Sequence, residues 1–237
     1  MTPADPDRAV PHGDDPHGDD PRGDDPQGAV GDQARRGARA VLVARLYRYG
    51  ITDERVLAAM ATVPRERFVP PAHAAHAYRN QTLPLGDGQT MSTPWIVGVM
   101  AAALELTGTE RVLEVGGGAG YAAAVLSRCA AGVLTIERHL RLAAQARTTL
   151  AALGYHNVEV RHGDGTHAGA DRAPFDAISV AAVAAEPPTA LRAQLAPHGR
   201  LVCPVGTPDA GRLVRLRGDF GEDLGPVRFV PLITDPP

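Results

Sequence analysis

Val112-Leu-Glu-Val-Gly-Gly-Gly-Ala-Gly-Tyr121 is the stretch that decides the fold of this 237-residue chain. Its apolar first half predicts a short buried strand, which ends in the glycine loop 116–120 before a helix that begins at Tyr121. Glycines at such a junction leave bare backbone N–H groups at a helix N-terminus, where a ligand can approach closely. Glu114 lies inside the strand just before the glycines, so a cationic ligand suits the site better than a pyrophosphate.

The segments after the loop continue the alternation of strands and helices. A second apolar strand, 132–136, ends at Glu137, close to the spacing of about 20 residues at which an acid takes ribose hydroxyls. A third strand begins at Val158 and closes on Asp164-Gly165, a pair that suits an adenine edge. These elements occur in the order that is typical of an S-adenosylmethionine-dependent methyltransferase: strand, glycine loop, helix, strand, acid, helix, strand and Asp.

Composition narrows the class of protein. Hydrophobic residues make up 44% of the chain, enough for a packed core, and no apolar run reaches the roughly 18–20 residues of a membrane span. No signal peptide pattern opens the chain, so we expect a cytoplasmic protein without a membrane partner. Cys129 and Cys203 lie in apolar contexts without metal-ligand spacing, which predicts packing residues and no metal site.

Charge divides the chain into two parts. Residues 1–32 hold nine aspartates against two arginines and repeat Pro-His-Gly-Asp-Asp, which predicts a disordered tail. The remainder has too small a positive balance to indicate a nucleic-acid partner. We therefore expect a methyltransferase domain at 33–237, with N-terminal helices and a substrate loop at 33–94 and a Rossmann-like core at 95–237.

Sequence patterns also predict the outer elements. A helix is expected at 33–49, a second at 53–61 with Thr52 as its N-cap, and a third at 95–106 capped by Ser92 or Thr93. Between them, the polar loop 81–94 has the composition of a lid or substrate loop. Beyond the third strand of the core, we expect a helix at 188–195 and further strands at 175–181, 199–206, 212–217 and 227–233.

From about residue 50 to 233 the chain resembles the protein-L-isoaspartate O-methyltransferase family. Beside the glycine loop, the resemblance rests on the segments Val63-Pro-Arg-Glu-Arg-Phe-Val-Pro70, Leu83-Pro-Leu-Gly-Asp-Gly-Gln-Thr-Met-Ser92, Arg161-His-Gly-Asp-Gly165, Ala173-Pro-Phe-Asp-Ala-Ile178 and Val227-Arg-Phe-Val-Pro-Leu-Ile233. The family implies an α/β fold, namely a Rossmann-like seven-stranded methyltransferase sheet with helices on both faces, behind an N-terminal helical cap. It further implies methylation of the α-carboxylate of L-isoaspartyl residues, which starts repair through a succinimide.

The resemblance also implies roles for individual residues. Ser92 would orient the substrate carboxylate and act as the catalytic residue, and the substrate site would consist of Thr90, Met91, Ser92, Ala181 and Ala182. S-adenosyl-L-methionine would be held by Glu114, Gly116, Gly118, Gly120, Glu137, Asp164 and Gly165. The expected partners are isoaspartyl-containing proteins or peptides, and the expected state is a monomer.

Two segments depart from the family pattern. The glycine loop, usually Gly-Thr-Gly-Ser-Gly, here lacks both hydroxyls at Gly117 and Ala119, and Ala181-Ala-Val-Ala184 replaces Thr-Ala-Ala-Pro. One alternative is therefore a methyltransferase of the same fold that modifies an Asp carboxylate in a dedicated peptide. Another is a non-catalytic protein that binds S-adenosylmethionine, although the retained Ser92 and Glu137 oppose it. A nicotinamide dehydrogenase is disfavoured because the glycine spacing is Gly-x-Gly-x-Gly.

Overall fold

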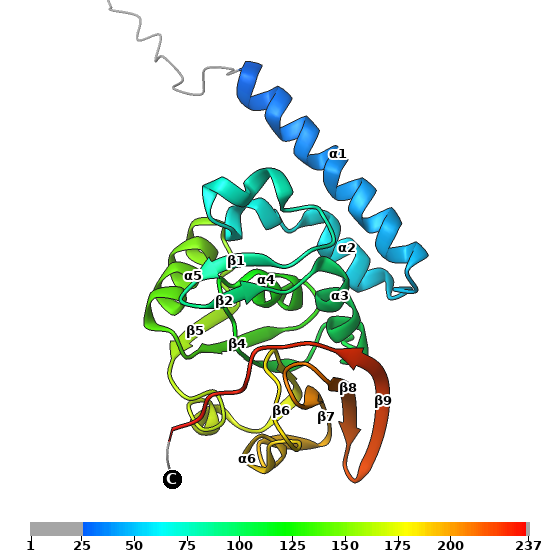
Figure 1. The fold of residues 1–237 in the computed structure, drawn as a ribbon, viewed down its shortest axis with the longest axis vertical. Coiled ribbons are helices and arrows are strands. Elements are labelled where there is room, and N and C mark those ends of the chain that lie inside the picture. The colour runs from blue at the N-terminus through cyan, green and yellow to red at the C-terminus, as the bar shows by residue number, and fades with distance from the viewer. Residues whose placement is uncertain (1–25, 236–237) are drawn as a thin grey trace, which may run out of the picture. The chain divides into compact units, whose positions relative to one another are not determined.

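A seven-stranded sheet forms the centre of the computed structural model, which describes residues 26–235 (Figure 1). The chain divides into two units after Arg35, and the fold described below is that of the second unit. The strand order is β5-β4-β3-β6-β7-β8-β9. Strands β3 to β7 run parallel to one another, and β8 pairs antiparallel with both β7 and β9. Their bounds are β3 Arg111–Val115, β4 Gly132–Glu137, β5 Val158–His162, β6 Phe175–Val180, β7 Leu195–Gly206, β8 Gly211–Arg217 and β9 Phe220–Val227.

Helices and a small hairpin complete the fold. The α-helices are α1 Pro26–Arg48, α2 Glu54–Thr62, α3 Pro94–Ala103, α4 Tyr121–Ser127, α5 Leu140–Ala152 and α6 Thr189–Arg192. Three short 3₁₀ helices are η1 Arg65–Phe68, η2 Pro71–His76 and η3 Ala170–Arg172. The predicted substrate loop contains an antiparallel hairpin, β1 Leu83–Gly86 and β2 Gln89–Met91. The predicted Rossmann-like α/β fold is confirmed.

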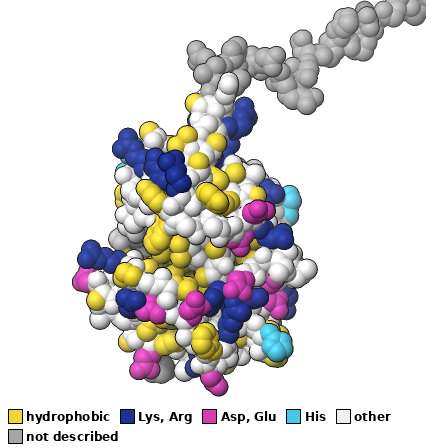
Figure 2. All heavy atoms as spheres, turned by 90° about the vertical axis from the view of Figure 1, so that its right-hand side faces the viewer, with side chains coloured by type: hydrophobic (Ala, Val, Ile, Leu, Met, Phe, Trp, Pro, Cys, Tyr) yellow, Lys and Arg dark blue, Asp and Glu magenta, His cyan; other side chains and the backbone are white. Residues whose placement is uncertain are grey.

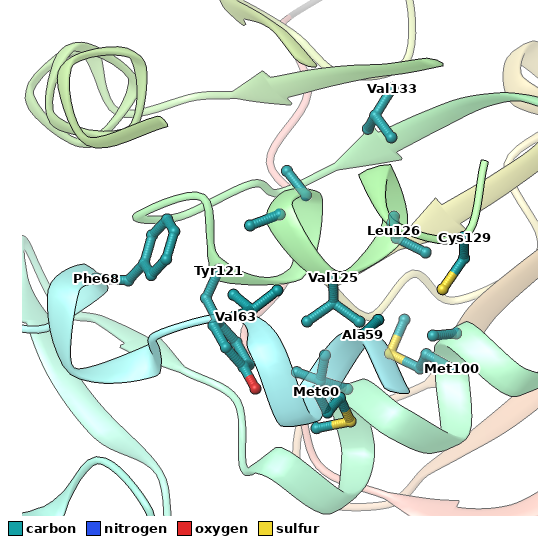
Figure 3. Packing of buried hydrophobic residues seen from close by; sticks show 14 of the residues in the cluster. Ala59, Met60, Val63, Phe68, Met100, Tyr121, Val125, Leu126, Cys129 and Val133 are labelled. Atoms are coloured by element: carbon teal, nitrogen blue, oxygen red, sulfur yellow. The ribbon is translucent and has the colours of Figure 1, made fainter. Parts of the chain in front are cut away.

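The period of two along the strands sends apolar side chains to both faces of the sheet. Val112 of β3 and Val133 of β4 belong to the larger core, which also contains α2 to α5. Leu113 and Leu134 point to the opposite face, where Leu191 of the short helix α6 joins them. In Figure 3, Met60 of α2, Met100 of α3 and Val125 of α4 lie close together in the larger core. The long helices therefore cover one face, and short segments cover the other.

Both cysteines are buried and unpaired, which confirms their predicted packing role. Burial raises the pKa of Cys129 to about 11 and that of Cys203 to about 12. Over the lower half of the face shown in Figure 2, arginine and acidic side chains lie side by side. Pairs such as Arg212 with Asp223 are part of the β8–β9 hairpin. Among residues 26–235, no helix combines the length and the apolar character needed to cross a membrane.

Several predicted boundaries at the N-terminal side are wrong. Helix α1 begins at Pro26, ahead of the expected start at 33, because proline suits the first turn of a helix. Most of the predicted tail, 1–25, lies outside the described residues. Asp53, and not Thr52, caps α2 by accepting a hydrogen bond from the Val56 backbone N–H at 3.0 Å. The negative charge of a carboxylate in that position also interacts favourably with the positive end of the helix dipole.

Other predicted boundaries are wrong near the C-terminus and in α3. The predicted strand 227–233 is not formed; the last strand is β9, which Gly218, at φ +54°, connects to β8 through a tight turn. After β9 only Pro231 forms an isolated bridge, to Val183, since a proline has no N–H to continue a ladder. Helix α3 ends at Ala103, three residues before the predicted end. Helix α6 spans only Thr189–Arg192, because β7 already begins at Leu195.

We expect Gly120→Ala to destabilise the fold more than Gly50→Ala. Both glycines have φ near +90°, but a Cβ at Gly120 would lie 3.0 Å from Leu150 Cδ1, whereas open space surrounds a Cβ at Gly50. Overpacking adds roughly 1–3 kcal/mol to the backbone strain that the two variants share. Urea unfolding of both variants measures the difference, and equal losses would contradict the packing role of Gly120.

Candidate active site

A cleft opens where the carboxyl ends of β3, β4 and β6 meet the β1–β2 hairpin. It consists of three adjoining cavities, which all include Thr90 and Ala181. The first two also share Gly116 and Gly118. Parallel sheets bind ligands at this edge because the strand ends present open loops there.

The glycine loop closes tightly over the end of β4. The backbone N–H groups of Gly116 and Gly117 both donate to the Ile136 carbonyl oxygen, at 2.8 and 3.2 Å. Gly118, at φ +55°, lies under the hairpin, where a Cβ would stand 3.3 Å from Leu85 Cδ1. Of the three predicted loop glycines, Gly116 and Gly118 line the cleft, whereas Gly120 packs against α5 and reaches none of the three cavities.

Glu114 is the most deeply buried acid of the cleft, with 1% of its surface exposed. Strand register places it between Thr135 of β4 and Ser179 of β6, and the Thr135 hydroxyl donates to Glu114 Oε2 at 2.6 Å. Burial raises the pKa of Glu114 to about 7, against the lowering effect of this hydrogen bond, and the nearby Glu137 raises it further. A cation in the cavity would therefore stabilise the ionised form.

The missing loop hydroxyl has a structural counterpart beside Glu114. A Cβ at Gly117 would lie 2.1 Å from Thr135 Oγ1, so a side chain at Gly117 and the present position of the Thr135 hydroxyl exclude each other. In this chain Thr135 of β4 donates the hydroxyl hydrogen bond to Glu114. Glu114 therefore keeps a hydroxyl donor although the loop has glycine at position 117.

Glu137 ends β4 and faces the second cavity. Its two oxygens accept hydrogen bonds from the Gly118 N–H at 2.7 Å and the His139 N–H at 2.8 Å. These bonds fix the carboxylate beside the glycine loop and occupy two of its several acceptor positions. The remaining positions are available to hydroxyl groups of a ligand.

Asp164 and Gly165 follow β5 at the same edge. Burial acts to raise the pKa of Asp164, but hydrogen bonds from Thr166 and from the Asp235 backbone N–H outweigh it and lower the pKa. Gly165 lines the second cavity, and a Cβ there would lie 2.2 Å from Val115 Cγ1. Asp164 itself is not among the residues that line the cavities.

The predicted substrate residues come together at the junction of the cavities. Thr90 and Met91 belong to β2, and Ser92 lies directly after it, lining both the first and the third cavity. The cap of α3 is Thr93, which accepts from the Ile96 N–H at 3.2 Å, so Ser92 does not have the alternative capping role. Ala181 and Ala182 follow β6 and line the second cavity.

Sequence patterns did not reveal several residues of the cleft. Tyr121, Met100 and Ser179 line the first cavity, and the segment 230–233 after β9 lines the second. Ser179 could have been found from strand register, because it lies directly opposite Glu114. Thr135, which donates to Glu114, carried no signal that distinguishes it from a core residue. Arg65 lies in the segment Val63–Pro70 that carries the family resemblance, but that pattern did not indicate its contact with the Ser92 main chain.

The chemistry of the cleft fits S-adenosylmethionine. Glu114 and Glu137 line the cleft and are both buried, and neither forms a salt bridge within residues 26–235. Buried carboxylates without basic partners suit a ligand that brings a positive centre and hydroxyl groups. The bare backbone at Gly116 and Gly118 leaves space for that ligand to approach.

Comparison with known proteins agrees with this geometry. The family model for protein-L-isoaspartate(D-aspartate) O-methyltransferase matches residues 38–235. This chain belongs to that family. A protein-L-isoaspartate O-methyltransferase of Roseiflexus castenholzii is 54% identical over 199 residues, covering 82% of this chain and 91% of the relative. A Methylorubrum extorquens member is 53% identical over 213 residues, covering 86% and 91% of the two chains.

Solved structures of the family have the same fold. A protein-L-isoaspartate O-methyltransferase superposes with a TM-score of 0.71 at 28% identity, covering 81% of this chain and 65% of that chain. A Plasmodium falciparum protein assigned to the family, solved with S-adenosyl-L-homocysteine, has a TM-score of 0.71 at 23% identity. That match covers 83% of this chain and 99% of the other, which shows the shared fold.

We expect Glu114→Gln to change how stability of this family member depends on pH. The folded pKa is about 7 and the ordinary value 4.5, so between these values the folded protein binds more protons than the unfolded chain. The contribution of Glu114 to the free energy of unfolding therefore falls as pH rises from 4.5 to 7, and it no longer changes at higher pH. The variant should gain on the order of 3 kcal/mol over wild type between pH 5 and pH 8.

Urea unfolding at the two pH values measures this gain. Glu186→Gln, at an exposed position between β6 and α6, is the control and should leave the pH dependence unchanged. A wild-type pH dependence that persists in Glu114→Gln would show that another group is responsible.

Proposed function

We propose that this chain transfers a methyl group from S-adenosylmethionine to the α-carboxylate of L-isoaspartyl residues in proteins or peptides. The observation that carries the proposal is the position of Ser92 at the junction of two cavities, one of which contains Glu114 and the glycine loop. Membership of the family and 54% identity to a relative of that name support the same reaction.

The substrate needs orientation more than activation. An α-carboxyl group has a pKa near ~3.5, so at pH 7 it is already an ionised nucleophile and needs no general base. The Ser92 hydroxyl would donate a hydrogen bond to one carboxylate oxygen and thereby aim the other. Met91 and Met100, which line the first cavity, would exclude water from the reacting atoms.

Three acids would hold the cofactor, which when bound supplies an electrophilic methyl group on a positively charged sulfur. Glu114 would offset that charge, with its carboxylate fixed by the Thr135 hydroxyl. Glu137 would accept hydrogen bonds from ribose hydroxyls, and Asp164 with Gly165 would contact the adenine. Gly116 and Gly118 would leave space for close approach of the ligand. Gly120 would support the loop through its packing on α5.

Methylation would start repair of the damaged residue. A methyl ester is a better acyl donor than a free carboxylate. The following backbone nitrogen attacks the ester carbonyl carbon, and methanol leaves with the N–H proton, which gives a succinimide. Water then opens the succinimide, in part to normal aspartate. We propose that the protein acts as a cytoplasmic monomer on isoaspartyl proteins or peptides, with Thr90, Met91, Ala181 and Ala182 beside the substrate. We assign methyl transfer to residues 33–237 and no catalytic role to the tail 1–32.

A methyl-transfer assay tests the proposal directly. Radiolabelled S-adenosylmethionine is incubated with an isoaspartyl peptide and with its aspartyl counterpart of identical sequence. Label in the isoaspartyl peptide alone supports the proposed reaction. Preference for the aspartyl peptide would indicate a dedicated Asp methyltransferase, and cofactor binding without turnover would indicate a binding protein.

Ser92→Ala should lower kcat/KM for the isoaspartyl peptide by about 10- to 150-fold. One hydrogen bond to a charged group is worth roughly 1.5–3 kcal/mol, and cofactor affinity does not depend on it. Thr93→Ala is the matched control for capping and should cost about 1 kcal/mol of stability, which Ser92→Ala should not. Unchanged turnover in Ser92→Ala would remove its catalytic assignment.

Glu137→Ala should weaken binding of S-adenosylmethionine by at least tenfold, since charge-assisted hydrogen bonds to hydroxyl groups are worth roughly 1.5–3 kcal/mol each. Calorimetry measures the dissociation constant, and turnover at saturating cofactor should change far less. Glu159→Ala, on the neighbouring strand β5, serves as the control. A dissociation constant within threefold of wild type would show that Glu137 is not the ribose acid.

A further inference from the structure

Arg65 is a completely buried cation in η1. Its Nε donates to the Ala77 carbonyl oxygen at 2.8 Å, and Nη2 donates to the Ser92 carbonyl oxygen at 2.7 Å. The guanidinium carbon lies 4.6 Å from the centre of the Tyr121 ring. One side chain therefore connects the end of η2, the substrate loop and the first residue of α4.

No carboxylate forms a salt bridge with Arg65 within the described part of the chain, and its Nη1 has no hydrogen-bond partner there. The adjacent Glu66 instead accepts from Tyr78 and pairs with Arg39 at 3.8 Å. Burying a guanidinium without a counter-charge is costly, and an apolar side chain of similar volume would avoid that cost. What the guanidinium adds at this place is the pair of bonds to two main-chain carbonyls.

The bond to Ser92 acts on the residue that lines both the first and the third cavity. Tyr121, which the guanidinium stacks on, lines the first cavity as well and packs edge-on against Phe68, with ring centres 5.9 Å apart. Figure 3 shows Tyr121 among the buried residues of the larger core, which also includes Phe68 and Val63. The main chain at Ser92 is thus anchored to the same rigid core that supports the glycine loop.

We propose that Arg65 is a positioning residue, which fixes the Ser92 main chain against α4 so that the Ser92 hydroxyl meets the substrate carboxylate. This inference rests on the proposed function. Arginine suits the role because its planar group donates in two directions while its face stacks on Tyr121. Lysine has a single donor nitrogen and would hold one carbonyl less firmly.

Arg65→Met and Arg65→Lys test the proposal. Methionine removes both donors, while its thioether still packs on the Tyr121 ring. In Arg65→Met, kcat/KM for an isoaspartyl peptide should fall by about tenfold or more, with affinity for S-adenosylmethionine within threefold of wild type by calorimetry. Arg65→Lys should recover part of the lost turnover.

The single tryptophan of the chain gives a readout that does not require activity. Trp95 lies in the first turn of α3, close after Ser92, and its backbone N–H donates to Asn80 Oδ1 at 3.0 Å. If Arg65 holds this segment, acrylamide should quench Trp95 fluorescence more strongly in Arg65→Met than in wild type. Arg128→Met, which removes a guanidinium 4.9 Å from the Tyr155 ring, is the matched control and should change neither quenching nor turnover.

Unchanged quenching and turnover in a folded Arg65→Met protein would overturn the proposal. If that variant does not fold, Arg65→Lys decides: reduced turnover with intact cofactor affinity supports the role, and wild-type turnover overturns it. If wild type does not methylate the isoaspartyl peptide, the proposed function fails, whereas the quenching comparison still tests whether Arg65 holds the loop.

Discussion

The rest of the site depends on a carboxylate buried at the end of β3 without a basic partner. Glu114 has 1% of its surface exposed, and Thr135 of the neighbouring strand is its one hydrogen-bond donor among residues 26–235. Because burial of a charge is costly, the protein bears an energetic penalty that a cationic ligand relieves. The first cavity is therefore suited to a positive group before any residue of the loop contributes.

The backbone segments around Glu114 have little space for side chains. Val115 leaves no room for a Cβ at Gly165, and the present Thr135 rotamer leaves none at Gly117. Small residues in these positions let the glycine loop and the loop after β5 pass close to the ends of β3 and β4. Loss of the usual loop hydroxyls is consistent with an intact site, since Thr135 already donates to Glu114.

The segments before α3 add the proposed substrate side to the proposed cofactor half. Phe68 of η1 packs on Tyr121 of α4, and Arg65 connects η1 and the end of η2 to the Ser92 main chain. The hairpin is held at its tip by Arg141 of α5, which bonds Asp87 and the Leu85 carbonyl oxygen. Substrate loop and cofactor loop therefore share supports, although they lie far apart in the sequence.

The sequence by itself determined the parallel core and the places of three acids at the ends of its strands. Apolar runs of strand length, glycines at their ends and acids at fixed spacing are local patterns, so β3, β4, β5 and the acids Glu114, Glu137 and Asp164 could be read from them. Local patterns failed where pairing decides the outcome: the last strand became β9, because the turn at Gly218 returns the chain onto β8. Only the tertiary structure brought Thr135 against Glu114 and Arg65 against Ser92, since these contacts depend on strand register and on packing between distant segments.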